Sequence, residues 1–300
     1  MKIENIADLR VLVETARGGT LTAAGHALGL TPAAASAMLK RLEAQMGARL
    51  FERSTRAMRL TAQGQTLLDY ALRALELLEE GEAQIASELG TLVGTVRLAA
   101  PSDLARSVLL PWLDAFQQAH PGVQLALSVS DRVQDVVRDA VDVALRYGAL
   151  GDSGLVAREL FVSQPVLCAS PAYLARHGAP ATPQDLLQHN CLSFQIKGRR
   201  HVRWRFVRNG EWTEVQVTGN RSADDAAIVH QWALAGHGLC FKSRLDLVHD
   251  LASGALVRVL PEWQGPDYPL NAVLPSGRFV PVRVQALVAH LMVCARTVVG

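Results

Sequence analysis

The stretch from Thr20 to Leu42, TLTAAGHALGLTPAAASAMLKRL, constrains the fold of this 300-residue chain more than any other. Apolar residues in its first half recur at three- and four-residue steps, which predicts a short helix that ends at Gly29. Glycine can adopt the left-handed conformation that a tight turn between helices requires. Thr31 is a suitable N-cap with Pro32 at the first helical position, so a second helix should begin there. The stretch therefore predicts two short helices joined by a tight turn.

The second predicted helix has two different faces. Its apolar face, which we expect to be buried, consists of Ala35, Met38, Leu39, Leu42 and Met46. Its other face is small near the start and cationic toward the end, and consists of Ala33, Ser36, Ala37, Lys40 and Arg41. Such a face suits insertion into a DNA major groove between flanking phosphates. A generic helical hairpin is the alternative that this segment alone leaves open.

Positive charge is concentrated in the N-terminal part of the chain. Residues 1–60 hold nine Lys and Arg against five Asp and Glu, whereas the whole chain has a net charge of +2. Four of these cations surround a short Ser-Thr turn within residues 49–61: Arg49, Arg53, Arg56 and Arg59. Apolar residues on both sides of the turn predict a two-stranded ribbon. A basic ribbon beside two such helices is a wing, whose arginines can reach DNA phosphates or a narrow minor groove.

These features resemble the N-terminus of the LysR-type transcriptional regulators. The resemblance is carried by TAAGHALGLT at residues 22–31 and by RLEAQMGARLFERSTRAMRLTAQG at residues 41–64, and it extends over essentially the whole chain. It implies a winged helix-turn-helix that binds double-stranded promoter DNA sequence-specifically. It also implies a C-terminal domain through which an unknown small-molecule effector modulates that activity, with RNA polymerase as a further candidate partner.

Nine residues of these segments are candidate DNA contacts: Thr31, Pro32, Ala33, Ser36, Ala37, Lys40, Arg41, Arg53 and Arg56. The recognition face departs from the family in one respect. Family members often carry arginine or glutamine at the position of Ala37, and Ala33 is apolar as well, so fewer side chains can hydrogen-bond to base edges. Ser36, methyl contacts from the alanines and shape readout through the wing would then do more of the discrimination.

A long helix is predicted for residues 61–90, with Thr61 as its N-cap. About 27 helical residues would extend roughly 40 Å, which is too long for the small domain before them to cover. We expect the helix to pair with the same helix of a second chain and form a homodimer. The two DNA-recognition helices of that dimer would lie about 34 Å apart, or a multiple of that distance. Packing along the chain's own C-terminal domain is the alternative. The family resemblance further implies a homotetramer built through the C-terminal domains.

Strands and helices alternate beyond a hinge at residues 90–94, which predicts an α/β fold with parallel strands and crossover helices. The first expected strands and helices are a strand at Val96–Ala100, a helix from residues 101–103 to Phe116, a strand at Val123–Val129, a helix at Val133–Ala140 and a strand at Val141–Leu145. Later in the chain, residues 202–217 alternate on both sides of Asn209-Gly210. This pattern predicts a hairpin with a type I′ turn.

The resemblance implies that the C-terminal part folds as two α/β lobes, like a periplasmic binding protein, with the effector in the cleft between them. The expected division is a winged helix-turn-helix at residues 1–60, a dimerisation helix at residues 61–90 and an effector-binding domain at residues 91–300. Within that domain, lobe one would comprise residues 91–162 and 267–300, and lobe two residues 163–266.

Turns that follow strands, helix starts and two aromatic residues supply the candidate effector contacts: Ser102, Asp103, Ser130, Arg146, Tyr147, Phe194, Trp204, Ser222 and Asp224. Structural alternatives exist for several of them. The two serines at helix starts and Asp224 would serve equally well as helix caps. Arg146 would serve in a salt bridge, and Trp204 in the core. Asp103 argues against an effector whose polar groups are all carboxylates, because it would repel them.

A second basic cluster lies in the region of the predicted hairpin: Lys197, Arg199, Arg200, Arg203, Arg205 and Arg208. One interpretation places it beside bent DNA. The other makes it the solvent-exposed face of the hairpin, with cations alternating outward between Val202, Trp204 and Phe206. We prefer the second interpretation because it is simpler.

Composition and motifs exclude several other classes. No run approaches the roughly 18 apolar residues of a membrane span, and the N-terminus lacks the apolar region of a signal peptide, so we expect a cytoplasmic protein without membrane contact. The four cysteines and nine histidines show no metal-ligand spacing, so we expect no metal and no cofactor. Cys191, near the second basic cluster, is a candidate for redox sensing.

The chain lacks the common hydrolase, metalloprotease and nucleotide-binding motifs, so we expect no enzyme activity and no catalytic residue. The rival hypothesis is a stand-alone small-molecule binding protein or an enzyme domain on the same two-lobed fold. That hypothesis would account for residues 92–300, but not for the wing or for the long helix.

Overall fold

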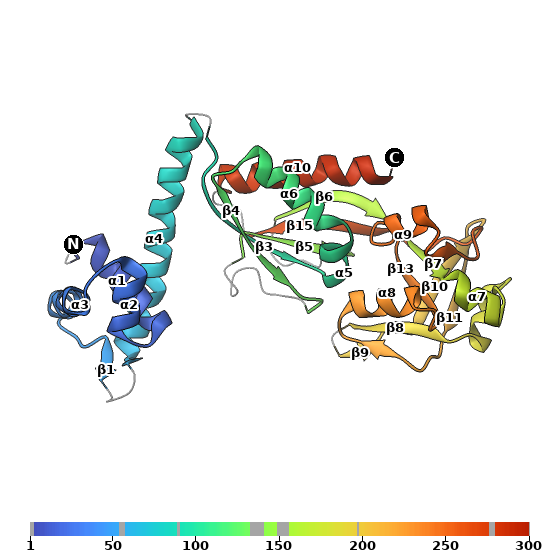
Figure 1. Ribbon diagram of the computed structural model, residues 1–300, viewed down its shortest axis with the longest axis horizontal. Helices are drawn as coiled ribbons and strands as arrows, with labels where there is room; N and C mark the ends of the chain where they lie inside the picture. The colour runs from blue at the N-terminus through green and yellow to red at the C-terminus, as the bar shows by residue number, and fades with distance from the viewer. Residues whose placement is uncertain are drawn as a thin grey trace. The chain divides into compact units, whose positions relative to one another are not determined.

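The computed structural model describes residues 3–53, 58–88, 91–132, 141–148, 156–196, 198–275 and 280–299 (Figure 1). The chain divides into two compact units, residues 1–86 and residues 87–300. The predicted helix at Val133–Ala140 lies outside the described residues, as do Arg56 and Lys197. Among the helices of the described part, none is both long enough and apolar enough to cross a membrane.

The first unit combines short helices, a two-stranded ribbon and a long helix. Its elements are α1 (Ile6–Gly18), α2 (Leu21–Leu28), α3 (Pro32–Met46), β1 (Phe51–Arg53), β2 (Met58–Leu60) and α4 (Ala62–Glu88). Threonine caps the starts of α2 and α3: the Thr20 hydroxyl accepts a hydrogen bond from the Ala23 N–H, and the Thr31 hydroxyl accepts one from the Ala34 N–H. The predicted helix pair and its Thr31 cap are therefore confirmed.

Two glycines make the turn between α2 and α3 tight. Gly29 has a φ of 65°, in the left-handed region that the sequence predicted for this position. A Cβ atom on Gly25 would lie 2.8 Å from the Leu30 carbonyl oxygen, closer than such atoms can approach. Backbone contact therefore sets the position of α3 relative to α2.

The apolar face predicted for α3 packs into the core of the first unit. Leu39 and Leu42 are fully buried, together with Leu12 of α1 and Phe51 of β1. Met46, at the end of the same face, is only half-buried. One side of α3 is thus fixed by the core, which leaves its other side at the surface.

The start of α4 is held against the ribbon. The Thr61 hydroxyl accepts a hydrogen bond from the Gly64 N–H at 2.9 Å, which confirms Thr61 as the N-cap. A Cβ atom on Gly64 would lie 2.0 Å from the Leu50 carbonyl oxygen, so only glycine fits where the helix passes β1. Ala71 is buried in the core of the unit, and α4 then continues beyond it.

The second unit contains two larger sheets, and each sheet with its helices forms one lobe (Figure 1). Lobe one has the strand order β4-β3-β5-β15-β6. Its elements are β3 (Gly94–Ala100), α5 (Ser102–Leu104), a π-helical turn (Ala105–Leu109), α6 (Leu110–Ala119), β4 (Val123–Val129), β5 (Val143–Tyr147), β6 (Val156–Ser163), β15 (Tyr268–Leu274) and α10 (Val282–Val299). Strand β3 runs parallel to β4 and β5, as predicted, whereas β15 runs antiparallel to β5 and β6.

Lobe two has the strand order β12-β8-β13-β7-β14, with β9 paired to β8. Its elements are β7 (Pro165–Ala169), α7 (Pro171–His177), a 3₁₀ helix (Pro183–Gln188), β8 (Cys191–Ile196), β9 (Arg199–Arg200), β10 (Arg203–Arg208), β11 (Glu211–Gln216), β12 (Ser222–Ala223), α8 (Ala226–Leu234), β13 (Leu239–Ser243), α9 (Val248–Ser253) and β14 (Val257–Arg258). The chain enters this lobe between β6 and β7 and leaves it between β14 and β15. The Gln164 side-chain amide donates a hydrogen bond to the Asp267 carboxylate at 3.0 Å, which joins the two crossings.

The start of α8 differs from the sequence prediction. The helix begins at Ala226 rather than Asp224, because the Asp225 carboxylate accepts hydrogen bonds from the first free N–H groups and so caps it. Ser222 lies in strand β12 and does not open a helix. The predictions that Ser222 and Asp224 form this helix N-terminus were therefore wrong.

The predicted hairpin is present as the antiparallel pair β10 and β11. Asn209 and Gly210 between them have φ angles of 53° and 82°, which are the positive values that a type I′ turn requires at both central positions. Trp204 and Phe206 are each 1% exposed and lie in the core of lobe two. The hairpin prediction is confirmed.

The arginines of this hairpin alternate outward between its buried aromatic residues. Arg203, Arg205 and Arg208 are exposed. Arg208 forms an ion pair with Glu262 at 3.2 Å, and the guanidinium of Arg205 lies over the Trp212 ring. This arrangement supports a solvent-exposed hairpin face over the alternative of a second nucleic-acid surface.

Candidate functional site

The exposed face of α3 is a small, partly polar surface that ends in a cation. Its exposed or half-buried residues are Thr31, Pro32, Ala33, Ser36, Ala37 and Lys40. The methyl groups and the Ser36 hydroxyl lie near the helix start, and the Lys40 ammonium lies two turns further on. A surface of this kind fits the width of a major groove, with the cation near the backbone phosphates.

Arg41, one of the predicted DNA contacts, is half-exposed and paired with a buried carboxylate. Its guanidinium makes two hydrogen bonds to the carboxylate of Asp8, at 2.8 and 2.5 Å, and the Asp8 side chain is fully buried. The hydrogen bond and the negative charge of Asp8 raise the pKa of Arg41. The arginine therefore neutralises a buried carboxylate of α1 and fixes α3 to α1.

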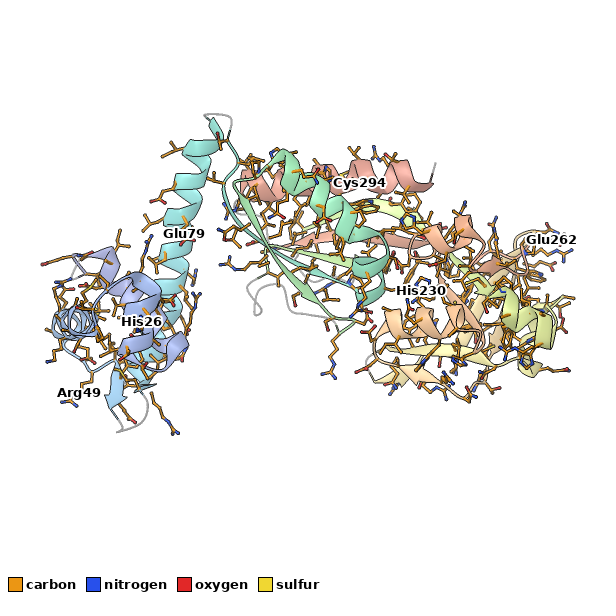
Figure 2. All side chains as sticks on the ribbon, in the orientation of Figure 1. His26, Arg49, Glu79, His230, Glu262 and Cys294 are labelled. Atoms are coloured by element: carbon orange, nitrogen blue, oxygen red, sulfur yellow. The ribbon has the colours of Figure 1, made fainter. Side chains whose placement is uncertain are left out.

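The wing is described in part. Arg49 and Arg59 are exposed on either side of its tip, and Arg49 lies beside the ribbon in Figure 2. The Met58 N–H donates a hydrogen bond to the Gly19 carbonyl at 3.0 Å, which ties β2 to the end of α1. The side chain of Arg53 and the whole of Arg56 lie outside the described residues.

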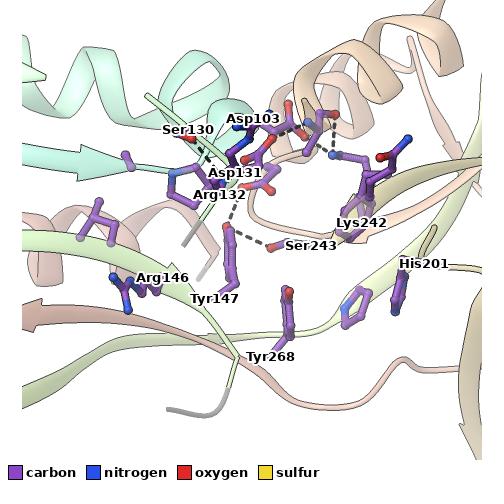
Figure 3. Close-up of a pocket in the computed structure, with 18 of the residues that line it drawn as sticks. Asp103, Ser130, Asp131, Arg132, Arg146, Tyr147, His201, Lys242, Ser243 and Tyr268 are labelled. Carbon is purple, nitrogen blue, oxygen red and sulfur yellow. Dashed lines mark hydrogen bonds and ion pairs between the residues drawn. The ribbon is translucent and has the colours of Figure 1, made fainter. Parts of the chain in front are cut away.

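A cavity of about 330 Å³ lies between the two lobes of the second unit (Figure 3). Its walls come from the ends of β3 and β5 and the loop after β4 in lobe one, and from β8, β13 and the start of α8 in lobe two. The candidate effector contacts that line it are Asp103, Ser130, Arg146, Tyr147 and Phe194. The structure thus brings five widely spaced residues together in one cleft.

The other four candidate residues lie elsewhere. Trp204 is buried in the core of lobe two, because it points inward on an alternating strand. Ser222 pairs within a sheet, and Asp224 is exposed and 3.6 Å from Arg132. Ser102 is buried behind the cleft wall. The prediction that Trp204 forms an apolar wall of the cleft was wrong.

A buried charged cluster joins the lobes behind the cleft. Asp103 of α5 forms an ion pair with Lys242 of β13 at 2.6 Å and a second with His230 of α8 at 2.8 Å. Burial alone would raise the pKa of Asp103, but the charge of Lys242 and the hydrogen bond from His230 hold it below its ordinary value. His230, labelled on α8 in Figure 2, has a pKa that burial works to lower and Asp103 raises. Lys242 and His230 of lobe two therefore neutralise the charge of Asp103, so an effector in the cleft does not meet an unpaired carboxylate at this position.

A second buried carboxylate lies beside this cluster. Asp246 accepts a hydrogen bond from the Tyr147 hydroxyl at 2.5 Å, and the Ser243 hydroxyl donates one to the same tyrosine oxygen at 3.2 Å. Burial and the nearby charge of Asp103 raise the pKa of Asp246 to about 7. Burial also raises the pKa of Tyr147 well above its usual value, so the hydroxyl stays protonated. The cleft floor is thus a hydrogen-bonded network that joins β5 of lobe one to β13 of lobe two.

Aromatic rings form the remaining walls of the cleft. Tyr147 and Tyr268 stack with centroids 5.2 Å apart, and Phe194 stacks on His201 at 5.2 Å. Burial lowers the pKa of His201, which favours its neutral form. Its Nδ1 atom is buried and has no hydrogen-bond partner among the described residues. The aromatic walls of the cleft therefore suit a flat or apolar molecule.

Several cleft residues were not predicted from the sequence: Asp131, Lys242, Asp246, His201 and Tyr268. A signal existed for Lys242, because it interrupts the apolar strand LCFKS, where a charge must be paired to be buried. Asp131 follows the predicted strand at 123–129 directly, and the rule that led to Ser130 applies to it as well. No local pattern marks the other three.

Cys191, the candidate redox sensor, is buried in the core of lobe two. Burial raises the pKa of its thiol to about 12. The reactive thiolate is therefore scarce at neutral pH, which argues against redox sensing at this position. In the described part of the chain, no group of histidine, cysteine, aspartate and glutamate is arranged to hold a metal ion.

Two family models match the chain, one in each unit. A bacterial regulatory helix-turn-helix model of the lysR family matches residues 6–65, and a LysR substrate binding domain model matches residues 90–293. The chain belongs to the LysR family of transcriptional regulators. Its helix-turn-helix and its effector-binding domain make it a DNA-binding regulator, and the recognition and fold predicted from the sequence are confirmed. The rival hypothesis of a stand-alone binding protein or enzyme domain leaves the first match unexplained.

Similar proteins span nearly the whole of this LysR-family chain. An HTH-type transcriptional repressor of Pseudomonas aeruginosa (strain UCBPP-PA14) is 33% identical over 97% of this chain and 92% of its own length. The HTH-type transcriptional regulator DmlR of Escherichia coli (strain K12) is 34% identical over 86% of this chain and 84% of its own. The solved structure of CrgA, a LysR-type transcriptional regulator from Neisseria meningitidis, has 28% sequence identity and a TM-score of 0.61, and the match covers 99% of this chain and 100% of CrgA.

Proposed function

We propose that residues 1–60 contact operator DNA, that residues 61–90 pair two chains, and that residues 91–300 bind the effector. The effector would bind between lobe one (residues 91–162 and 267–300) and lobe two (residues 163–266). The observation that carries the proposal is the exposed face of α3, whose opposite side is fixed in the core. A helix held in this way can present its free side to a major groove without rearrangement.

The DNA contacts divide into base readout and phosphate binding. Ala33, Ala37 and Ser36 would approach base edges, mainly through methyl groups and one hydroxyl. Thr31, Pro32 and Lys40 would lie at the groove edge, with the lysine on a phosphate. Arg53 and Arg56 would reach the backbone or the minor groove from the wing. Arg41 would act indirectly, because it orients α3 through Asp8.

The Lys40→Ala variant is expected to weaken binding to all DNA sequences to a similar degree, because a phosphate contact carries no base preference. Each lost phosphate contact lowers the slope of log affinity against log salt by about 0.9, so a dimer should lose nearly two units. Fluorescence anisotropy with DNA from the region upstream of the gene, over a sodium chloride series, measures this slope. Arg296→Ala is the matched control, since it removes one exposed cation from the second unit. An unchanged slope for Lys40→Ala would contradict the assignment.

The long helix α4 has an exposed apolar stripe that suits pairing with a second chain. Along one side of α4, Leu67, Leu68, Ala71 and Leu75 pack into the first unit itself. Another row remains exposed at three- and four-residue spacing: Tyr70, Ala74, Leu77, Gly81 and Ile85. Exposed apolar rows of this kind mark helix pairing surfaces. A homodimer through this row is the proposal, with a homotetramer through the C-terminal domains as the larger assembly.

The double variant Leu77→Glu, Ile85→Glu is expected to convert dimers to monomers at micromolar concentration, because it places four carboxylates in the proposed interface of each dimer. Both side chains are mostly exposed within the chain, at 68% and 64%, so the first unit should remain folded. Sedimentation velocity measures the change in mass. The control is Glu79→Gln, Glu82→Gln, which alters two exposed side chains of α4 outside that row. Retention of the dimer in the first variant would favour the alternative packing of α4.

The effector contacts proposed in the cleft are Asp103, Ser130, Arg146, Tyr147 and Phe194. Binding would change how the two lobes close, and altered packing between chains would then change the spacing of the DNA-binding heads and the bend that they impose on DNA. RNA polymerase is the further partner through which such a change would act on transcription. The proposed function includes no enzyme activity and assigns no catalytic residue.

A further inference from the structure

One carboxylate of the chain bridges the two lobes at the edge of the cleft. Asp131, in the loop after β4, accepts a hydrogen bond from the Ser102 N–H at 2.8 Å and another from the Ser102 hydroxyl at 2.5 Å. The same carboxylate accepts a third from the N–H of Ala226, the first residue of α8, at 2.6 Å. Ser102 belongs to lobe one and Ala226 to lobe two. An oxyanion bound at a helix start would accept hydrogen bonds from donors of this kind. In this chain the Asp131 carboxylate occupies that position.

The neighbouring contacts hold this arrangement in place. The Ala227 N–H donates to the Ser102 hydroxyl at 3.1 Å, so the hydroxyl proton is directed toward Asp131. The Ser130 N–H donates to the Ala100 carbonyl at 3.1 Å, and the Arg132 N–H donates to the Ser130 hydroxyl at 3.1 Å. The backbone on both sides of Asp131 is therefore held by contacts within lobe one. A preorganised, tethered carboxylate binds with a high effective concentration.

We propose that Asp131 is a built-in ligand of the cleft, which holds the lobes together and excludes small carboxylates from the donors of Ser102 and Ala226. The proposal rests on the proposed role of this cleft as the effector site. An effector with a single acid group would have to displace a tethered competitor at that position. The effector class that fits the occupied cleft is an uncharged, flat molecule that packs on Tyr268 and Phe194.

Removal of the Asp131 carboxylate should create a binding site for a free carboxylate of the same chemistry. The Asp131→Ala variant is expected to lower the unfolding midpoint of the second unit by about 5 °C in sodium chloride, because three hydrogen bonds to a charged acceptor are lost. About 0.2 M sodium acetate or formate, at matched ionic strength, should recover most of this loss, and the recovery should saturate with concentration. The unfolding midpoint of wild type should be the same in sodium acetate as in sodium chloride.

Two further variants define the site. In Asp131→Ala, Ser102→Ala, the acetate response should weaken, because the hydroxyl donor is lost and only the N–H groups of residues 102 and 226 remain. The control Asp224→Ala removes an exposed carboxylate that lies near Arg132 and does not line the cleft, and it should show neither the loss nor the acetate response. If acetate stabilises wild type and Asp131→Ala equally, or stabilises neither, the proposal is overturned.

The outcome remains decisive if Asp131→Ala does not fold. Asp131→Asn keeps the side-chain shape and one acceptor oxygen, so it isolates the charge. A wild-type midpoint for Asp131→Asn overturns the proposal, and a loss of several degrees that Asp224→Asn does not show supports it. The acetate measurement requires neither DNA nor effector. Its failure therefore leaves the DNA-binding proposal standing, and a failed DNA-binding assay leaves the acetate result standing.

Discussion

Replacement of Lys242 by methionine is expected to cause the largest loss of stability among single substitutions in the second unit. Methionine keeps most of the side-chain length but carries no charge. The buried Asp103 carboxylate would lose its 2.6 Å partner and keep the ion pair with His230 and the hydrogen bond from the Ser107 hydroxyl. Breaking a buried ion pair by removal of one partner typically costs about 3–5 kcal/mol. For a domain of this size the midpoint should fall by about 10 °C, measured by differential scanning calorimetry of the full chain.

The double variant Asp103→Asn, Lys242→Met separates the ion pair from side-chain packing. It removes both charges, and the asparagine oxygen can still accept the hydrogen bond from His230, so it should recover at least half of the loss. Lys40→Met, at an exposed position in the first unit, is the control and should leave this transition unchanged. A double variant as unstable as Lys242→Met would show that packing around Lys242, and not the charge of Asp103, determines the loss.

The parts of the fold that the sequence predicted are those fixed by neighbouring residues. Thr31, Pro32 and Gly29 act within four residues of one another, and the structure gives them the predicted cap and turn. The Asn209-Gly210 turn is equally local. The start of α8 was misplaced because Ser222, Asp224 and Asp225 could each cap it, and Asp225 was the residue whose carboxylate reached the free N–H groups.

The cleft was predicted less completely because its chemistry depends on distant pairs. Asp103 meets Lys242 and His230 across the lobes, and no sequence spacing indicates such a contact. The Arg41–Asp8 pair is a similar case in the first unit, since 33 positions separate the partners. From the sequence alone, a cation that binds phosphate on a recognition helix cannot be distinguished from one that pairs with a buried carboxylate.

The Asp246→Asn variant is expected to be more stable than wild type at pH 8, with a difference that shrinks as the pH falls from about 7 toward 3.8. The pKa of Asp246 is raised to about 7 from an ordinary value of 3.8, mainly by burial and then by Asp103. Between these values the folded chain holds a proton that the unfolded chain has released, so the free energy of unfolding falls as the pH rises through this window. Above about pH 7 the loss is complete and amounts to up to about 4 kcal/mol. Thermal midpoints at half-unit pH steps measure it.

His230 and Asp103 also contribute to the pH dependence of the free energy of unfolding. The raised pKa of His230 also favours the folded state at low pH, and this contribution is lost as the pH rises through the raised value. The lowered pKa of Asp103 acts in the opposite direction, since its contribution is lost only in acid below its ordinary range. Wild type should therefore lose stability as the pH rises from 3.8 to about 7, and Asp246→Asn should retain only the shallower part due to His230. Asp114→Asn, at an exposed position of α6, should follow the wild-type profile. Parallel profiles for wild type and Asp246→Asn would show that Asp246 is ionised throughout this range, and that the network under the cleft carries a full negative charge at neutral pH.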